Sequence, residues 1–237
     1  MIRHDFFTFN GVNSLDYGVI FVDPQTENTP ERDTETISIP GRNEDLLLSS
    51  GRWKNTEIVY HVAILERFLD RYRDLRNALL SPTGYCRLED SIHPDEYRLA
   101  TILAPVEPET FGFHELGLFD LTFYADPRRF LRAGEKSVQF SAPGQLHNPC
   151  SFPASPLIQV QGNGGGSVSI GGCTVQINAM SGSLTLDCEL QNAYNEDGNQ
   201  NKNIRAPAFP QLQPGSNAVS WTGGVTGLSI TPRWWQL

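Results

Sequence analysis

The chain has 237 residues and a hydrophobic content of 39%, typical of a globular protein with one large core or two smaller ones. Its formal net charge of -9 argues against a protein that grips nucleic-acid phosphates, because such binding needs clustered Lys and Arg. No apolar run approaches the roughly 20 residues that span a bilayer, and the first residues, MIRHDFFTFNG, lack the apolar core of a signal peptide.

The first half of the chain predicts strands and one helix. Apolar runs at residues 6–14 and 17–23 predict strands, and the polar stretch 24–36 predicts an exposed loop. Residues 37–65 alternate in places and carry turn residues, which predicts a hairpin. The helix follows from an apolar stripe at spacings of three and four, which we expect to face the core. The stripe consists of Leu65, Phe68, Leu69, Tyr72, Leu75 and Leu79.

The second half reads as strands separated by turns. Residues 84–90, 97–105 and 116–126 predict strands, and composition changes near Ser141. Residues 141–156 are rich in Pro, Ser and Gly, so we expect them to link two domains. Beyond them, Gly and Asn turns separate short strands, which is typical of a β-sandwich. These strands are expected at residues 156–162, 166–172, 174–179, 183–194, 217–224 and 227–235. The predicted fold class is mainly β with one amphipathic helix, in two domains, 1–140 and 141–237.

Two loops resemble ligand-binding motifs without completing them. In YNEDGNQNKN (194–203), a calcium loop with Gly198 at its sixth position would place Ala193 and Ile204 at the anchoring ends, where neither side chain ligates a cation. We predict a solvated turn there. The stretch GNGGGS (162–167) lacks the Lys of a phosphate-binding loop and continues as a strand, so we predict a hairpin.

The acidic stretch LEDSIHPDEYR (88–98) is the best candidate for acid–base chemistry of the kind a glycosidase performs. Its titratable side chains are Glu89, Asp90, His93, Asp95 and Glu96. The neighbouring Arg87 and Arg98 offer neutralising partners, which favours a structural role over a catalytic one.

The remaining candidate residues for a functional site are cysteines and tryptophans. The four cysteines form no CxxC pair, so we expect free thiols and no zinc or redox site. Trp234 and Trp235 could stack on a sugar ring, but in a strand they point to opposite faces, so at most one can join a given platform. Packing in a core or an interface is the favoured alternative.

An ordered set of segments carries a resemblance to a known family. The segments are FNGVNSLDYGV, LEDSIHPDEYRLA, GLFDLTFYADPRRFL, LIQVQGNGGGSVSIGG, LTLDCELQNAY, FPQLQPGSN and SITPRWW. Together they resemble the distal tail protein family of long-tailed siphophages, over nearly the entire chain.

The resemblance implies a structural protein without enzymatic activity, cofactor or metal. Residues 1–140 would form a ring-forming belt domain and residues 141–237 a galectin-like β-sandwich. Six copies would close a ring at the tail tip of the virion, after assembly in the cytoplasm of the bacterial host. The implied partners are the tail tube protein, a tail-associated lysin or tail fibre, and receptor-binding or baseplate proteins. DNA would only pass through the channel, no membrane would be involved, and an acidic wall would not hold the DNA.

Cyclic closure requires two different surfaces on each subunit. The N-terminal strands and the hairpin GRNEDLLLSSGRWKN (41–55) are the candidate interfaces, with Arg42, Asn43, Trp53 and Asn55 as the candidate residues of the hairpin. The alternative function is a carbohydrate-binding adhesion module that stacks sugars on Trp234 or Trp235.

Overall fold

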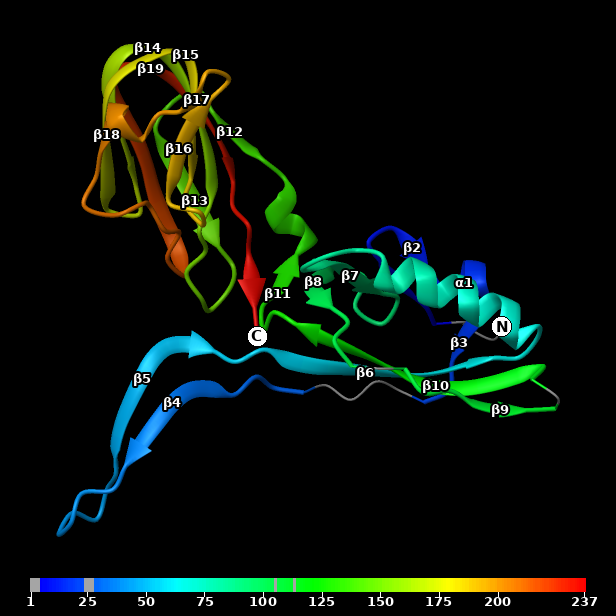
Figure 1. The fold of residues 1–237 in the computed structure, drawn as a ribbon. Helices are drawn as coiled ribbons and strands as arrows, with labels where there is room; N and C mark the ends of the chain where they lie inside the picture. Colours follow the sequence, from blue (N-terminus) through cyan, green and yellow to red (C-terminus); the bar gives the residue numbers. More distant parts are fainter. Residues whose placement is uncertain (1–4, 24–27, 105, 113) are drawn as a thin grey trace. The chain divides into compact units, whose positions relative to one another are not determined.

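The computed structural model describes residues 5–23, 28–104, 106–112 and 114–237 (Figure 1). The fold is mainly β, and the described residues contain one α-helix. The chain separates into two compact units, the first running up to Arg129 and including Leu237, the second spanning Phe130–Gln236. The division falls before the predicted boundary at residues 140 and 141. The reason is that residues 138–140 already pair with a strand of the second unit.

The first unit contains a mixed set of short and long strands. Their bounds are β1 (Phe7–Phe9), β2 (Val12–Asn13), β3 (Val19–Phe21), β4 (Arg32–Ile37), β5 (Leu46–Trp53), β6 (Thr56–Ile64), β7 (Cys86–Asp90), β8 (Glu96–Thr101), β9 (Glu109–Phe111) and β10 (Leu116–Ala125). A short 3-10 helix, η1, covers Ser14–Tyr17. The main sheet has the order β2-β1-β7-β8-β10-β6-β3, and β9 pairs with β10. Within the described residues, the strands β4 and β5 pair only with each other.

The core of the first unit lies between this sheet and helix α1 (Phe68–Leu80) (Figure 1). Strand β10 alternates strictly, so that Phe119, Leu121 and Phe123 point inward while the residues between them face outward or are half-buried. The strand β6 pairs with β10 in register over its whole length and adds Tyr60 to the same side. The predicted strands at residues 84–90, 97–105 and 116–126 therefore exist, although Pro105 lies outside the described residues.

The predicted helix is confirmed, but part of its predicted stripe is wrong. Phe68, Leu75 and Leu79 are buried, as expected for the core side. Leu65 precedes the helix and is 53% exposed, and Leu69 is 57% exposed. The helix begins only after Arg67, so Leu65 is not part of it. Successive helical residues differ by about 100°, so Leu69 lies beside the buried stripe and not within it.

The predicted loop at 24–36 is also partly wrong. Residues 24–27 lie outside the described residues, but residues 32–36 belong to β4. The predicted hairpin is present, and its first strand starts earlier than expected because Arg32 pairs with Trp53.

The second unit consists of strands and two short 3-10 helices. The strands are β11 (Arg129–Leu131), β12 (Val138–Phe140), β13 (Gly144–Asn148), β14 (Leu157–Ile170), β15 (Cys173–Asp187), β16 (Asn192–Asn195), β17 (Gly198–Asn199), β18 (Ile204–Arg205), β19 (Gly215–Thr231) and β20 (Trp235–Gln236). The 3-10 helices are η2 (Arg132–Glu135) and η3 (Asn201–Asn203). The sheet has the order β12-β19-β14-β15-β16-β17, with β13 on β19 and β18 on β15.

The three long strands β14, β15 and β19 curve over near their middle, so that one sheet forms two layers around a core (Figure 1). The hairpin predicted at 162–167 is wrong, since these residues lie inside the unbroken strand β14. The register shifts at Gly162, Gly164 and Gly166, and a Cβ on the facing Gly224 would meet the carbonyl oxygen of Asn163. The glycines therefore serve a bulged bend with close backbone approach.

The link predicted at 141–156 is wrong as well. Residues 144–148 form β13, which pairs with β19. Ala154 exchanges two backbone hydrogen bonds with Leu212, of 3.0 and 2.9 Å, and both residues are fully buried. The stretch is part of the second unit. None of the described helices has the length and apolar character needed to cross a membrane.

Candidate functional site

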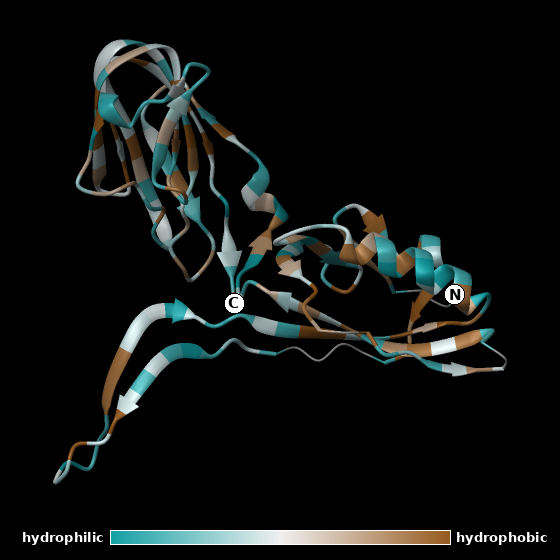
Figure 2. Cartoon of the chain, in the orientation of Figure 1, coloured by the Kyte–Doolittle hydropathy of each residue, from teal (hydrophilic) through white to brown (hydrophobic). Residues whose placement is uncertain are grey.

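The most unusual feature of the first unit is the ribbon formed by β4 and β5, named here the β4–β5 ribbon (residues 32–53). Strand β5 consists almost entirely of exposed residues, and β4 is exposed or half-buried. Three consecutive leucines open β5. Leu46 is 43% exposed, Leu47 64% and Leu48 48%. Figure 2 shows this hydrophobic stretch within β5.

A ribbon of two strands that lacks a covering layer is only marginally stable in water. Ile37 pairs with Leu46, and Thr36 with Leu47, so large apolar side chains gather at the outer half of the β4–β5 ribbon. Both ribbon edges carry unpaired main-chain groups, since β4 and β5 pair only with each other. Exposed leucines next to open strand edges are typical of a surface that another polypeptide covers.

Polar contacts hold the inner half of the β4–β5 ribbon. The guanidinium of Arg32 lies 4.2 Å from the centre of the Trp53 ring, in a cation–π contact. Asp33 lies 3.4 Å from Nε of Arg52 and accepts a hydrogen bond from the Ser50 hydroxyl at 3.2 Å. Each of these exposed contacts adds little stability, but together they fix the strand register.

The four predicted interface residues fall into two groups. Arg42 and Asn43 are exposed at the tip, in the loop between β4 and β5. Trp53 and Asn55 lie at the base, where the Asn55 amide donates a 2.5 Å hydrogen bond to the hydroxyl of Tyr85. Sequence reasoning missed the leucines between them, although the run LLL in a hairpin was a usable signal. The N-terminal strand β1, the other predicted interface, has Phe7 and Phe9 buried in the core.

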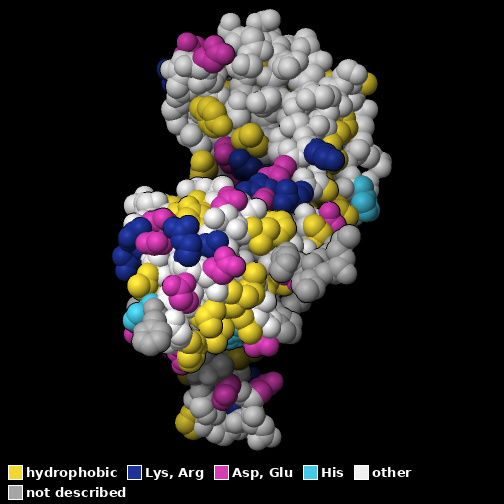
Figure 3. Space-filling model, turned by 90° about the vertical axis from the view of Figure 1, so that its right-hand side faces the viewer, with side chains coloured by type: hydrophobic (Ala, Val, Ile, Leu, Met, Phe, Trp, Pro, Cys, Tyr) yellow, Lys and Arg dark blue, Asp and Glu magenta, His cyan; other side chains and the backbone are white. Residues whose placement is uncertain are grey.

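A second exposed apolar surface lies at the end of the first unit formed by α1, β9 and β10. Figure 3 shows hydrophobic side chains gathered on one face of this unit, next to acidic and basic groups. The backbone N–H of Phe68 donates to the carbonyl of Glu115, so the start of α1 lies beside the start of β10. The exposed apolar residues near this junction are Leu65, Leu69, Phe111, Leu116 and Leu118. The first unit thus has two different apolar surfaces, named here the β4–β5 ribbon and the α1–β10 end.

The acidic stretch 88–98 forms a hydrogen-bonded turn between β7 and β8. Asp90 accepts a 2.9 Å hydrogen bond from the Tyr60 hydroxyl, and its other oxygen accepts from the backbone N–H groups of Ile92 and His93 at 3.0 and 2.7 Å. Burial, then the negative charge of Asp90, raise the pKa of Tyr60 well above its ordinary value.

The basic partners of this stretch are also engaged. Glu89 pairs with Arg87, and Glu96 lies 3.7 Å from Arg129. Burial lowers the pKa of Arg98, and the nearby Arg129 lowers it further. Glu89, Asp90 and Glu96 are bound to structural partners, in agreement with the structural role that the sequence favoured, and Asp95 is exposed.

The turn predicted at residues 194–203 is confirmed. The side-chain oxygen of Asn195 accepts from the backbone N–H of Asp197 at 3.0 Å, and that of Asn199 accepts from the N–H of Asn201 at 3.0 Å. Gly198 has a positive φ of 107°. The amide side chains serve the turn itself.

The tryptophans occupy different environments. Trp234 is 5% exposed and belongs to the core of the second unit, so its ring faces are not available for stacking on a sugar. Trp235 stacks on Phe152, with ring centres 4.7 Å apart, and donates a 2.9 Å hydrogen bond to the carbonyl of Pro153. All four cysteines are free, and Cys150 and Cys188 are buried.

Comparison with known proteins identifies the fold. No protein-family model matches the sequence, and no curated protein matches it. The crystal structure of SPP1 Dit (gp 19.1), described as a paradigm of the hub adsorption apparatus in phages that infect Gram-positive bacteria, is similar with a TM-score of 0.77. The match covers 99% of this chain and 100% of that chain, at 13% identity. A chain of the phage P2 baseplate in its activated conformation with Ca matches with a TM-score of 0.50 and 8% identity, over 97% of this chain and 98% of that chain. The chain has the fold of these phage proteins.

Proposed function

We propose that this protein is a non-enzymatic structural component of a phage tail, a distal tail hub at the tip of the virion. The observation that carries the proposal is the similarity to SPP1 Dit, which extends over both units and leaves almost no residue of either chain unmatched. A similarity limited to the second unit would have indicated only a common β-sandwich. Here residues of both units are part of the match.

The β4–β5 ribbon supports assembly as the working property of the molecule. Closed rings of identical subunits need a heterologous interface, in which one surface contacts a different surface of the next copy. The first unit offers such a pair, the β4–β5 ribbon with its three exposed leucines and the α1–β10 end. In the proposed hexameric ring each ribbon covers the α1–β10 end of its neighbour. Arg42 and Asn43 at the tip, and Trp53 and Asn55 at the base, would border the contact.

The proposed ring leaves a channel through which DNA passes in transit. The net charge of -9 agrees with this role, because a negative wall repels phosphates and does not retain them. The tail tube would bind one side of the ring, and a tail-associated lysin or tail fibre with receptor-binding proteins the other. The acidic stretch 88–98 supports a non-enzymatic role, since its carboxylates Glu89, Asp90 and Glu96 are bound to neighbouring side chains or main-chain groups.

The test is the solution mass and shape of the purified protein. Light scattering should give a particle close to six times the 26.4 kDa chain, and negative-stain microscopy should show closed rings. The same measurements after co-expression with a tail tube protein from the same source cover the case in which the tube is needed for closure. A monomer in both preparations, at the highest concentration reached, would contradict the proposal.

A further inference from the structure

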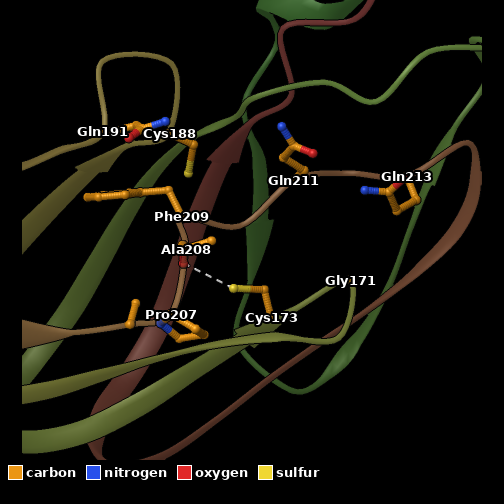
Figure 4. A pocket seen from close by; sticks show the side chains of 10 residues that line it. Gly171, Cys173, Cys188, Gln191, Pro207, Ala208, Phe209, Gln211 and Gln213 are labelled. Atoms are coloured by element: carbon orange, nitrogen blue, oxygen red, sulfur yellow. Dashed lines mark hydrogen bonds between the residues drawn. The ribbon is translucent and has the colours of Figure 1, made fainter. Parts of the chain in front are cut away.

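The second unit contains a pocket of about 580 Å³ that has no part in the proposed ring contact (Figure 4). One wall is the turn after β15 with Cys188 and Gln191, and the other is the irregular segment 206–213 with Phe209, Gln211 and Gln213. No Asp, Glu, Lys or Arg occurs among the described residues that line it. Its volume lies within the range of about 300–1,000 Å³ that is usual for small-molecule sites.

The turn wall is held by an ion pair between the buried Asp187 and the partly exposed Arg233. Arg233 donates to both carboxylate oxygens of Asp187, at 2.8 and 3.1 Å. The same carboxylate accepts from the backbone N–H groups of Glu189 and Leu190, at 3.1 and 3.2 Å. The turn ends at Gln191, whose φ of 51° is uncommon for a residue other than glycine. Gln191 is exposed and lines the pocket.

Two buried asparagines hold the opposite wall. Asn148 is 1% exposed and donates a 2.9 Å hydrogen bond to the carbonyl of Leu212. Asn217 is 2% exposed, accepts from the N–H of Gln213 at 2.8 Å and donates to its carbonyl at 2.7 Å. The segment therefore has a fixed path although it is not a strand. Both walls of the pocket are formed before any ligand arrives.

The groups that face the pocket are amides and one aromatic ring. The side-chain amides of Gln191, Gln211 and Gln213 have no hydrogen-bond partner within the part of the chain that the structure describes. Each amide offers two donors and a carbonyl acceptor. Phe209 is half-buried against the core and adds an apolar surface. Cys173 is already engaged, since its thiol donates to the carbonyl of Ala208 at 3.1 Å.

We propose that this pocket binds a neutral saccharide between a monosaccharide and a disaccharide in size. Amides donate to and accept from hydroxyl groups, and an aromatic ring packs on the apolar face of a sugar. A phosphate or a carboxylate would find no cation, and a metal ion would find no carboxylate, among the described lining residues. The site differs from the stacking platform considered for Trp234 and Trp235, and it does not depend on ring assembly.

A peptide is a poorer match to the same walls. Peptides that bind β domains usually add a strand to an open sheet edge through main-chain hydrogen bonds. Here the main chain of Leu212 is bound to Ala154, and that of Gln213 to Asn217. The donors and acceptors that remain for a ligand are mainly side-chain amides.

The experiment is saturation-transfer NMR on the full chain with glucose, galactose, N-acetylglucosamine, maltose and lactose as probes. At least one sugar should receive saturation, and titration of that sugar gives the affinity. The double variant Gln211→Ala and Gln213→Ala should weaken the affinity about ten-fold or more, because two hydrogen-bonding groups are lost. The matched control, Gln159→Ala with Gln161→Ala, removes two exposed glutamines of β14 that do not line the pocket and should leave the affinity unchanged.

Thermal unfolding of all variants separates loss of binding from loss of fold. If no sugar receives saturation, or if the pocket variant binds as the wild type does, the proposal is wrong. A mixture of tripeptides is measured in the same way. Saturation of peptides without saturation of sugars would also overturn it.

Discussion

Replacing Leu47 by Glu should dissociate the proposed ring. Leu47 is the most exposed of the three leucines that open β5, and it touches no core of its own unit. The substitution should therefore leave the isolated subunit folded, since a charge on an exposed strand residue has a small effect on stability. In the ring, however, the same side chain would be covered by the neighbouring subunit.

The magnitude follows from the exposed fraction. Full burial of a leucine side chain contributes about 1.5–3 kcal/mol, and Leu47 retains 64% of its surface for a partner, so its contact is worth about 1–2 kcal/mol. A glutamate at this position must also lose water from its carboxylate, which costs several kcal/mol more when no cation compensates it. We expect each contact to weaken by at least about a hundred-fold, since about 1.4 kcal/mol corresponds to a factor of ten.

Light scattering across a concentration series checks this expectation, with circular dichroism to verify that the variant folds. Leu190→Glu is the control, because Leu190 is 72% exposed but lies in the second unit, outside both surfaces of the proposed contact. The variant Leu47→Glu should be a monomer where the wild type and the control are rings. Equal assembly of both variants, or equal dissociation of both, would refute the role assigned to the β4–β5 ribbon.

Three further predictions concern the second unit. Burial alone would raise the pKa of Asp187, but hydrogen bonds from Arg233 and the backbone lower it below its ordinary value. The ionised Asp187 therefore stabilises the fold above about pH 4, and this contribution is lost as pH falls through the lowered pKa. In Asp187→Asn, the free energy of unfolding, measured with urea at a series of pH values, should fall less steeply at acid pH than in the wild type (this acid part of the curve is called the acid limb). Gly224→Ala should destabilise the fold by several kcal/mol in thermal unfolding, because its Cβ would meet a carbonyl oxygen of β14. Gly182 has open space around it but a φ of 76°, so Gly182→Ala should cost only about 1–2 kcal/mol. Burial raises the pKa of the Cys188 thiol to about 12, so it should react with a disulfide reagent at pH 8 far more slowly than a free cysteine, in a rate measured by absorbance.

Each of these predictions has a result that would contradict it. An Asp187→Asn variant whose acid limb matches the wild type would show that the ion pair does not link stability to pH. Equal loss of stability in Gly224→Ala and Gly182→Ala would show that backbone strain, and not close approach, dominates at the bend. Fast labelling of Cys188 without unfolding would show that burial does not suppress the reactivity of its thiol.

Local sequence patterns correctly predicted the strands and the helix that bury only one side. The alternation of β10 and the helical spacing of Phe68, Leu75 and Leu79 follow from periodicity alone, because each element has one buried side. Leu69 shows the limit of such patterns. Successive residues of a helix differ by about 100°, so Leu69 lies beside the stripe of Phe68, Leu75 and Leu79 and remains exposed although it is apolar.

Predictions that depended on distant partners were less accurate. Glycines suit both a hairpin turn and a bulged bend, so the stretch 162–167 looks the same in sequence for either structure. Only pairing with β15 and β19 makes it a bend. The Pro-rich residues 141–156 look like a link, yet β13 pairs with β19 through Gln145 and Ala218, far away in the sequence.

Of the candidate sites, the one formed by a local segment was predictable and the one formed by distant segments was not. The hairpin that carries Arg42, Asn43, Trp53 and Asn55 was predictable because the residues are contiguous, and its leucines could have been found from their run. The pocket could not have been predicted, since Gln191 and Gln211 line one cavity only after two asparagines, Asn148 and Asn217, hold an irregular segment in place. Nothing in the spacing of those asparagines marks them as partners of that segment.

The same physical difference explains how this chain shares its fold with a solved structure at 13% identity. Core positions such as Phe123 and Ile158 need only apolar side chains of suitable volume, so many sequences satisfy them. A surface ribbon needs exposed apolar side chains and open edges, and it needs a complementary surface on the next copy, but it specifies no catalytic geometry. The β4–β5 ribbon meets these conditions with three leucines, and it is only marginally stable by itself. If the proposed ring is correct, burial of those leucines both orders the β4–β5 ribbon and joins the subunits, so the ordering of this element and the assembly of the hub are one process.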